Sequence, residues 1–479
     1  MLDKIVSTIN NIVWSPALVI LLVGAGLYFS FRTRLVQVRR LGLMVRSLFA
    51  PAEKAPEGHR KGISSFEAFC VALSGRVGTG NIVGVATAIA FGGPGSIFWM
   101  WVIAFFGAST AFIESTLAQM YKFHHGTGYR GGPFSYIEKG LRSPWLGIVF
   151  AILGIIGYGL LLTTVQSNGV SSALRNSFNI NPLISGLGLA FVLGLVIIGG
   201  IKSISRVASI ITPFMALGYV IMTIFVIANY IEVIPSVFKA IVTGALGIRP
   251  VAGGILGSTI MMGVKRGIFS NEAGQGGGAI VSASASVSHP AKQGLAQAFS
   301  VYVDTIIICT ATALMILCSG TYNILDTNTG EILVAGAPEL GNNFVGFTQA
   351  AVDSVLQGFG SSFVGIALVF FAFTTIMAYY FYGESSIIYI FCRNGRNRRG
   401  EKLAIWLYRF AIIGMTIFGA LKEAGVIWQM GDIGVGMMAW VNVIALLILC
   451  PQAVRSLKEY EGQVRKGPRP LQSSDIDAK

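Results

Sequence analysis

Two glycine-rich stretches decide the fold: SGRVGTGN at residues 74–81 and FSNEAGQGGG at residues 269–278. Each lies inside a segment long and apolar enough to cross a membrane, residues 65–92 and residues 252–285. Glycine costs about 1 kcal/mol relative to alanine in a helix, so these clusters favour unwinding. Glycine used only for helix packing is the alternative, but packing does not require the Asn and Glu beside these glycines. We therefore predict two broken membrane helices.

The composition is that of a membrane protein. Of the 479 residues, 53% are hydrophobic and 12% are charged, whereas soluble proteins carry about 25% charged residues. This excludes a soluble enzyme, a disordered chain and a coiled coil. A membrane span needs about 20 apolar residues. Eleven segments qualify: 12–32, 65–92, 95–121, 144–167, 182–201, 208–232, 252–285, 294–319, 360–390, 403–420 and 425–450.

The positive charges predict the orientation of these spans. With the N-terminus outside, 26 of the 35 Lys and Arg residues lie in segments on the inside, five lie outside and four lie at membrane depth. This asymmetry fits the positive-inside rule. We therefore predict an integral protein of the bacterial inner (plasma) membrane with its C-terminus in the cytoplasm. The net charge of +14 is then a topology signal, and nucleic acid is not expected as a partner.

The two broken spans occupy matching places in the chain. Spans 2–6 form a first set of five, within residues 65–232, and spans 7–11 form a second set, within residues 233–450. Each set begins with its broken helix, and the two sets start on opposite sides of the membrane. The predicted fold is therefore an all-α polytopic bundle with a 5+5 inverted repeat. Residues 1–64 add one N-terminal span and a basic cytoplasmic loop, residues 320–359 form an extracellular loop, and residues 451–479 form a cytoplasmic tail.

A helix break of this kind offers one site for an anion and one for a cation. The second half of the first broken helix begins near Gly80 and Asn81, where free N–H groups and the positive end of the helix dipole favour a carboxylate. The first half ends near Gly75–Val77, where free carbonyl groups favour a cation, either sodium or an ammonium group. One break can therefore hold an amino acid and a coupling ion. These charges do not distinguish sodium from a proton.

Charged residues at membrane depth are functional candidates by default; these are Glu114, Arg266, Glu272, Asp304 and Arg409. We predict that an ion pair between Arg266 and Glu272 holds the second break in shape. Asp304 is predicted to support broken-helix backbone, with contact to a cation site as the alternative. Arg76 would repel sodium if it pointed inward, so we expect it to turn toward the cytoplasm.

Other functional classes lack their motifs. The sequence contains no Gly-x-Ser-x-Gly, no His-Glu-x-x-His and no transmembrane Asp pair, which argues against a membrane-embedded enzyme. It shows no repeated filter loop or charged ring, which argues against a channel. The absence of a phosphate-binding loop argues against direct use of ATP. We predict a secondary transporter that works as a monomer, uses no cofactor and binds no metal other than sodium.

Several motifs resemble one family; they are Gly78-Thr79-Gly80-Asn81-Ile82-Val83-Gly84, the run from Gly92 to Trp101, Arg130-Gly131-Gly132-Pro133, the run from Arg266 to Gly274, and Phe373-Thr374-Thr375-Ile376-Met377. Together they resemble the alanine/glycine:cation symporter family, also called the sodium:alanine symporters, over about residues 12–450. The resemblance implies a leucine-transporter-type fold with eleven spans. It also implies sodium-driven uptake of a small neutral amino acid, while a proton-coupled transporter of the same fold remains the alternative.

The resemblance also implies functional residues. The substrate contacts would be Gly78, Thr79, Asn81, Gln166, Phe269, Thr375 and Tyr379. Sodium would lie between the hydroxyl groups of Thr374 and Thr375 and the carbonyl groups of Ser74 and Val77. Arg266, Glu272 and Asp304 would serve structural or gating roles.

Each of these residues also has a structural interpretation. Gln166 could be a helix-end residue that faces water, Thr374 and Thr375 could bond to their own backbone, and Phe269 and Tyr379 could be packing residues.

The sequence departs from the family pattern in two places. Tyr379 stands where the family has tryptophan, and Ala378 where it has glycine. Gly277-Gly278-Ala279 replaces the usual Ser-Ala-Pro. A smaller aromatic side chain with a hydroxyl group would enlarge the pocket or make it more polar. Alanine, glycine, serine and glutamine therefore all remain candidate substrates.

Overall fold

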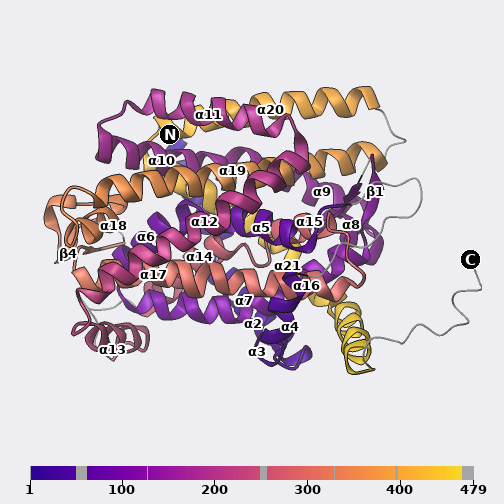
Figure 1. The fold of residues 1–479 in the computed structure, drawn as a ribbon, viewed down its shortest axis with the longest axis horizontal. Coiled ribbons are helices and arrows are strands. Elements are labelled where there is room, and N and C mark those ends of the chain that lie inside the picture. Colours follow the sequence, from indigo (N-terminus) through magenta and orange to yellow (C-terminus); the bar gives the residue numbers. More distant parts are fainter. Residues whose placement is uncertain are drawn as a thin grey trace, which may run out of the picture.

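The computed structural model describes residues 2–49, 62–126, 128–248, 256–327, 329–393 and 398–466. Long helices dominate it, and α7, α10, α19 and α20 run along its longest axis (Figure 1). The N-terminal part consists of α1 (Leu2–Val13), α2 (Pro16–Arg32), α3 (Val36–Arg39) and α4 (Leu41–Leu48). α3 and α4 occupy the first part of the basic loop predicted at residues 32–64, and residues 50–61 of that loop lie outside the described residues.

The first predicted five-helix set contains two broken or interrupted helices and one hairpin. Its elements are α5 (Ser65–Arg76), the π-helix η1 (Gly80–Gly84), α6 (Val85–Gly92), α7 (Gly95–Met120), β1 (Phe123–His125), β2 (Gly128–Arg130), α8 (Pro133–Gly140), α9 (Pro144–Gly154), the π-helix η2 (Ile155–Leu162), α10 (Thr163–Phe178), α11 (Pro182–Ile197) and α12 (Gly200–Ala228). The two strands pair antiparallel, with Phe123 opposite Arg130.

The second predicted set begins after a short helix. Its elements are α13 (Ile234–Ala245), α14 (Leu256–Asn271), α15 (Gly277–Ala283), α16 (Pro290–Val301), the π-helix η3 (Tyr302–Cys309), α17 (Thr310–Ser319), β3 (Asn323–Leu325), β4 (Ile332–Ala335), the 3-10 helix η4 (Pro338–Leu340), α18 (Phe344–Asp353), α19 (Gly360–Arg393), α20 (Arg398–Leu421) and α21 (Ala424–Lys466). The hairpin β3–β4 and α18 lie at one end of the molecule, and β1 and α8 lie at the other (Figure 1).

The described residues contain eight helices that are long and apolar enough to cross a membrane, or nine if the bent pair α5 and η1–α6 is one span. Two predicted spans do not pass this test although most of their described residues are helical. α11 is only 16 residues long, and residues 252–285 are divided between α14 and α15. The count of eleven spans therefore stays a prediction.

The surface and the interior have the polarity expected in lipid. Large apolar side chains point outward from the long helices: Phe191 on α11 is 69% exposed, Phe214 on α12 is 82% exposed and Phe410 on α20 is 67% exposed. The carboxylates of Glu114 and Glu272 are by contrast fully buried. Because lipid solvates apolar groups and not charges, the membrane is the environment in which this arrangement is stable.

Both predicted breaks are present. The first lies between α5 and η1, where Val77 leaves the helical conformation (φ −77°, ψ 89°) and the two halves bend by 51°. The second lies between α14 and α15 and uses left-handed backbone at Glu272 (φ +54°) and at Gly274 and Gly276 (φ +88° and +97°). Left-handed backbone is rare for a residue other than glycine. Glu272 is therefore held in its place by the structure around it.

Two predicted helix ends are wrong. The span predicted at 144–167 continues to Phe178, because α9, η2 and α10 form one continuous helix. Gln166 therefore lies in the interior of this helix and is 1% exposed, which corrects its interpretation as a helix-end residue facing water. The last span also continues, since α21 runs to Lys466 through Pro451.

Glycines allow the close contact between α7 and α14. A Cβ atom at Gly263 would lie 2.4 Å from the Ser96 carbonyl oxygen and 2.5 Å from Trp99 Cβ. Gly257, on the same helix, has no atom within 4 Å of its would-be Cβ. Gly263 is therefore needed for the packing of the two helices, whereas Gly257 is not.

We expect Gly263→Ala to destabilise the protein by about 1–3 kcal/mol, because backbone atoms would have to move apart. Gly257→Ala is the matched control and should be neutral or slightly stabilising, since alanine is the better helix former. Thermal unfolding of both variants in detergent would measure this difference. Equal stability of the two variants would show that α7 and α14 do not pack this closely.

Candidate functional site at the paired helix breaks

The first break presents its free backbone groups to α10. The amide of Thr79 donates to Oε1 of Gln166 at 2.8 Å, and the amide of Gly78 donates to Oδ1 of Asn81 at 2.9 Å. These are the unpaired N–H groups that a helix start leaves without an intrahelical partner. The predicted substrate contacts Gly78, Thr79, Asn81 and Gln166 are therefore brought together, around donors suited to a carboxylate.

Gly78 and Gly80 make room for this arrangement. A Cβ at Gly78 would lie 2.6 Å from Gln166 Oε1 and 2.6 Å from Thr375 Oγ1, and a Cβ at Gly80 would lie 3.0 Å from the Phe269 ring. The break thus needs glycine for close approach as well as for unwinding. Phe269, a predicted substrate contact, lies beside Gly80, and its ring also contacts Trp428, with centroids 5.1 Å apart.

Tyr379 belongs to a group of buried tyrosines beside the break. Its hydroxyl faces the side chains of Gln166 and Glu272. Its ring lies 5.4 Å from that of Tyr158 and 5.9 Å from that of Tyr382, measured between centroids. The departure from tryptophan therefore places a hydroxyl group at the predicted substrate pocket.

The free carbonyl groups at the end of α5 meet α19. The hydroxyl oxygen of Thr375 lies 2.8 Å from the carbonyl oxygen of Ser74 and 3.3 Å from that of Val77, and it also lies 2.8 Å from the Phe371 carbonyl oxygen in its own helix. The structure thus brings together three of the four predicted sodium ligands. The hydroxyl of Thr374 instead donates to the carbonyl groups of Phe370 and Phe371 in its own helix, at 2.9 and 3.0 Å. Adjacent residues on a helix point in different directions, so only one of the two hydroxyls reaches the break.

Asp304 on η3 links the two breaks. Its carboxylate accepts from Asn81 Nδ2 at 2.6 Å, from the Ser270 hydroxyl at 2.9 Å and from the Thr305 hydroxyl at 2.7 Å. Asn81 follows the first break and Ser270 precedes the second. Asp304 therefore bonds to side chains beside both breaks and not to their backbone, which the prediction had favoured.

Arg76 corrects another prediction. The side chain is 1% exposed and is buried between α14 and α16. Its Nε donates to the carbonyl oxygen of Asn271, the last residue of α14, at 2.6 Å, and its Nη1 donates to Gln297 Oε1 at 3.0 Å and to Ser300. The arginine is stable there because it satisfies a free carbonyl at the negative end of a helix.

The predicted ion pair between Arg266 and Glu272 is also wrong. Arg266 forms a bidentate pair with Asp432 on α21, at 3.1 and 2.9 Å, and Lys265 pairs with the same carboxylate at 2.8 Å. Glu272 instead accepts from the Tyr382 hydroxyl at 3.3 Å. The two residues are separated because α14 ends between them, so Glu272 no longer follows the helical spacing that would place it beside Arg266.

Asp432, Tyr158 and Tyr382 were missed by the sequence reasoning. An acid within a predicted span is itself a signal, and two adjacent basic residues, Lys265 and Arg266, required a partner. The tyrosines carried no comparable signal, because aromatic residues are common in membrane helices. Their role became visible only when α19 and η2 were placed side by side.

The glycines that depart from the family pattern have a steric reason. A Cβ at Gly277 would lie 2.6 Å from Glu272 Oε2 and 2.6 Å from Tyr382 Cε2. A Cβ at Gly278 would lie 2.5 Å from Arg76 Nη2. The absence of side chains at these two positions therefore allows the tyrosine and the arginine to reach the second break.

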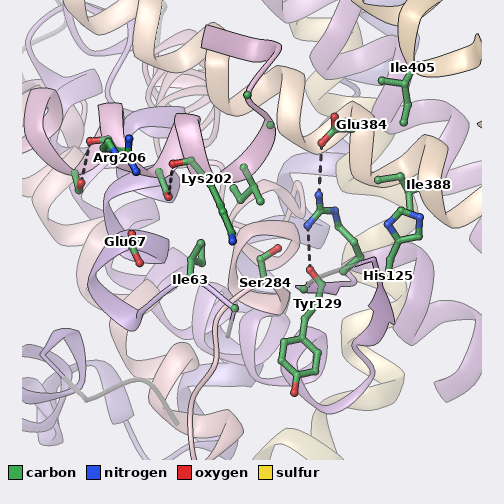
Figure 2. Close-up of a pocket in the computed structure, with 18 of the residues that line it drawn as sticks. Ile63, Glu67, His125, Tyr129, Lys202, Arg206, Ser284, Glu384, Ile388 and Ile405 are labelled. Carbon is green, nitrogen blue, oxygen red and sulfur yellow. Dashed lines mark hydrogen bonds and ion pairs between the residues drawn. The ribbon is translucent and has the colours of Figure 1, made fainter. Parts of the chain in front are cut away.

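A separate cavity of about 540 Å³ lies near the end of the molecule that carries the β1–β2 hairpin. Figure 2 shows Lys202 and Arg206 of α12 on one side of it and His125 and Glu384 on the other. Arg130 of β2 pairs with Glu384 across 3.6 Å. The cavity opens on the side that the positive-charge pattern predicts to be cytoplasmic.

The site defines a class of protein. Two broken membrane helices that face each other with free donors, free carbonyl groups and buried carboxylates are the arrangement of secondary transporters with a midplane binding site.

The chain belongs to the sodium:alanine symporter family, whose sequence pattern it matches over residues 1–474. It is 48% identical to the putative sodium/proton-dependent alanine carrier YrbD of Bacillus subtilis, over 97% of this chain and 94% of the relative. It is 41% identical to the probable sodium/glutamine symporter GlnT of the same organism (99% and 94%), and 36% identical to the sodium/alanine symporter AgcS of Methanococcus maripaludis (97% and 98%).

Solved structures agree on the fold. The transporter MhsT in complex with L-phenylalanine superposes with a TM-score of 0.58 at 13% identity, over 83% of this chain and 98% of that one. A sodium-coupled sialic acid symporter superposes with a TM-score of 0.51 at 15% identity, over 91% of this chain and 86% of that one. At such low identity the likeness shows the fold alone. The chain is thus an integral membrane protein with a transporter fold.

We expect Asp432→Asn to destabilise the protein by about 3–5 kcal/mol, because Lys265 and Arg266 would lose their buried counter-charge. Glu423→Gln is the control, since Glu423 is exposed on the segment before the same helix. Thermal unfolding in detergent would compare the two variants. A loss of stability in both or in neither would contradict the proposed importance of this buried pair.

Proposed function

We propose that the protein is a sodium-coupled symporter that imports a small neutral amino acid by alternating access. In this proposal it has eleven spans with a 5+5 inverted repeat and one extra N-terminal span. It lies in the bacterial inner membrane with its N-terminus outside and its C-terminus in the cytoplasm. A single chain contains both breaks, so the monomer is the transporting unit. The membership of the family and the convergence of both breaks on one buried site support this proposal.

The observation that carries the proposal is the bond from the Thr79 amide to Gln166 Oε1. A substrate carboxylate would take the N–H groups of this half-helix, and its ammonium group would bind the released Gln166 oxygen or nearby carbonyl groups. Phe269 and Tyr379 would form the walls around the substrate side chain. This pocket selects an amino acid because it offers donors to one end and acceptors to the other.

Sodium would bind where Thr375 meets the carbonyl groups of Ser74 and Val77. Hard oxygen ligands of this kind suit a small hard cation. Sodium at this point would order the end of α5 before the amino acid docks on the other half of the break. Closure would then follow by rocking of one group of helices against the other.

A proton is the second candidate for the coupling ion. Glu272 is fully buried, and its Oε1 has no hydrogen-bond partner among the described residues. A neutral, protonated carboxyl group would be more stable in such a place than an ion. One relative is named a putative sodium/proton-dependent alanine carrier. A sodium gradient and a proton gradient must therefore be compared as driving forces.

Uptake into proteoliposomes tests the proposal. An imposed sodium gradient should drive accumulation of labelled alanine, glycine, serine or glutamine, because inward sodium flow releases free energy. A proton gradient without sodium should not. Accumulation driven only by the proton gradient would overturn sodium coupling, and no accumulation of any amino acid under either gradient would overturn the proposed transport.

We expect Thr375→Ala to weaken apparent sodium affinity about tenfold, because a hydroxyl ligand between the two carbonyl groups is lost. Thr416→Ala is the matched control: its hydroxyl donates only within α20, to the Ile412 carbonyl at 2.8 Å. The sodium dependence of the initial uptake rate would measure both. Unchanged sodium activation in Thr375→Ala would remove this residue from the site.

We expect Tyr379→Trp to narrow selectivity toward alanine and glycine, because a larger ring without the hydroxyl would fill the pocket and remove a polar contact. A panel of unlabelled amino acids competing with labelled alanine would show the change. Serine and glutamine should compete less well against the variant than against the original protein. An identical competition profile would show that Tyr379 does not set specificity.

A further inference from the structure

Three elements bring metal-ligating side chains together beside the cavity of Figure 2. His125 ends β1, Cys392 lies in the last turn of α19, and Glu401 lies in the first turn of α20. One ligand atom from each of these side chains lies within 4.8 Å of the others. His125 Nε2 and Glu401 Oε1 are 3.0 Å apart.

The local structure explains why these side chains converge. Successive side chains of a strand point to opposite faces. His124 is exposed and its ring lies against Tyr129, with centroids 4.3 Å apart. His125 therefore points the other way, toward α19 and α20. Glu401 is 8% exposed, and Cys392 is half-buried. The cluster is thus partly shielded from water and built from fixed elements.

We propose that His125, Cys392 and Glu401 bind a thiophilic divalent cation, with Zn²⁺ as the preferred ion. Imidazole, thiolate and carboxylate are the ligands of zinc sites, with metal–ligand distances of about 2.0–2.3 Å. A tetrahedron of that size separates neighbouring ligand atoms by roughly 3.3–3.8 Å. The three ligand atoms lie within 4.8 Å of one another, and the distance between the His125 and Glu401 atoms is 3.0 Å. These distances bracket the separations in a tetrahedral site, so side-chain rotations suffice to form it.

The charges of the cluster fit a divalent ion. Deprotonation of the thiol on binding gives one thiolate and one carboxylate, which together neutralise two positive charges. Three protein ligands leave a fourth position for water. A soft sulfur ligand disfavours sodium, magnesium and calcium, which prefer oxygen. Two nearby arginines have carboxylate partners outside the cluster: Arg393 pairs with Glu138 at 3.0 Å, and Arg130 pairs with Glu384, although Arg130 also lies close enough to Glu401 to interact with its charge.

The position of the cluster beside the cavity would allow a bound ion to slow transport. His125 and Glu401 both line the 540 Å³ cavity, and the ion would tie the β1–β2 hairpin to α19 and α20. If the cavity changes shape during transport, this tie would slow the cycle. The effect on transport rests on the proposed function, but the binding of the ion does not.

Cobalt binding to the purified full-length protein tests the site directly. Co²⁺ should give a saturable near-ultraviolet absorption band from sulfur-to-cobalt charge transfer, and Zn²⁺ should displace it. Cys392→Ser should abolish the band, and His125→Ala should weaken Co²⁺ binding at least about tenfold. Cys450→Ser and His124→Ala are matched controls and should bind as the original protein does.

Two results would overturn the site. One is the absence of a saturable thiolate band in the original protein. The other is an unchanged band in Cys392→Ser.

A transport measurement separates this site from the proposed function. Zn²⁺ supplied on the cavity side should lower sodium-driven uptake by the original protein and not by Cys392→Ser. Equal inhibition of both proteins would overturn the effect on transport. Failure of all sodium-driven uptake would count against the proposed function alone, since the cobalt measurement in detergent does not depend on it.

Discussion

A buried arginine joins the two halves of the molecule, and the second break depends on it. Arg76 leaves the end of α5 and donates to the Asn271 carbonyl, where α14 stops. Each helix end would otherwise leave polar groups unpaired in an environment without water, at a cost of several kcal/mol per group. The first break therefore stabilises the second, and a change in the geometry of α5 must reach α14. This linkage gives a physical route by which an ion at one break can influence the other.

The need for buried side chains to reach the second break also bears on the glycines that depart from the family pattern. A Cβ at Gly278 would lie 2.5 Å from Arg76 Nη2, and a Cβ at Gly277 would lie 2.6 Å from Glu272 Oε2 and from Tyr382 Cε2. A serine or alanine at these positions would compel the arginine and the tyrosine to move. Both departures lie beside Glu272, since Gly277 borders its carboxylate and the hydroxyl groups of Tyr379 and Tyr382 face it.

Backbone features were predictable from the sequence, whereas side-chain pairing was not. Glycine clusters and polar residues in apolar segments located both breaks, because the cost of glycine in a helix is local. The contacts of Gln166 with Thr79 and of Thr375 with Ser74 followed from the family resemblance. The partners of Arg76 and Arg266 could not be predicted in this way. Sequence spacing placed Glu272 near Arg266, but the direction of each side chain depends on where the helix ends, and Asp432 lies far away in the chain.

The balance of buried charge bears on the coupling ion. On α14, before the second break, Lys265 and Arg266 share one carboxylate, that of Asp432. Around Glu272 the balance reverses, since Arg76 is accompanied by the buried acids Glu114 and Asp304 as well as Glu272 itself. If all three carboxyl groups were ionised, they would leave an excess of negative charge around one buried guanidinium. Hydrogen bonds and helix dipoles offset part of it, and a bound cation or proton would offset the remainder. In the proposed function, a coupling ion would therefore stabilise this interior as well as supply the driving force.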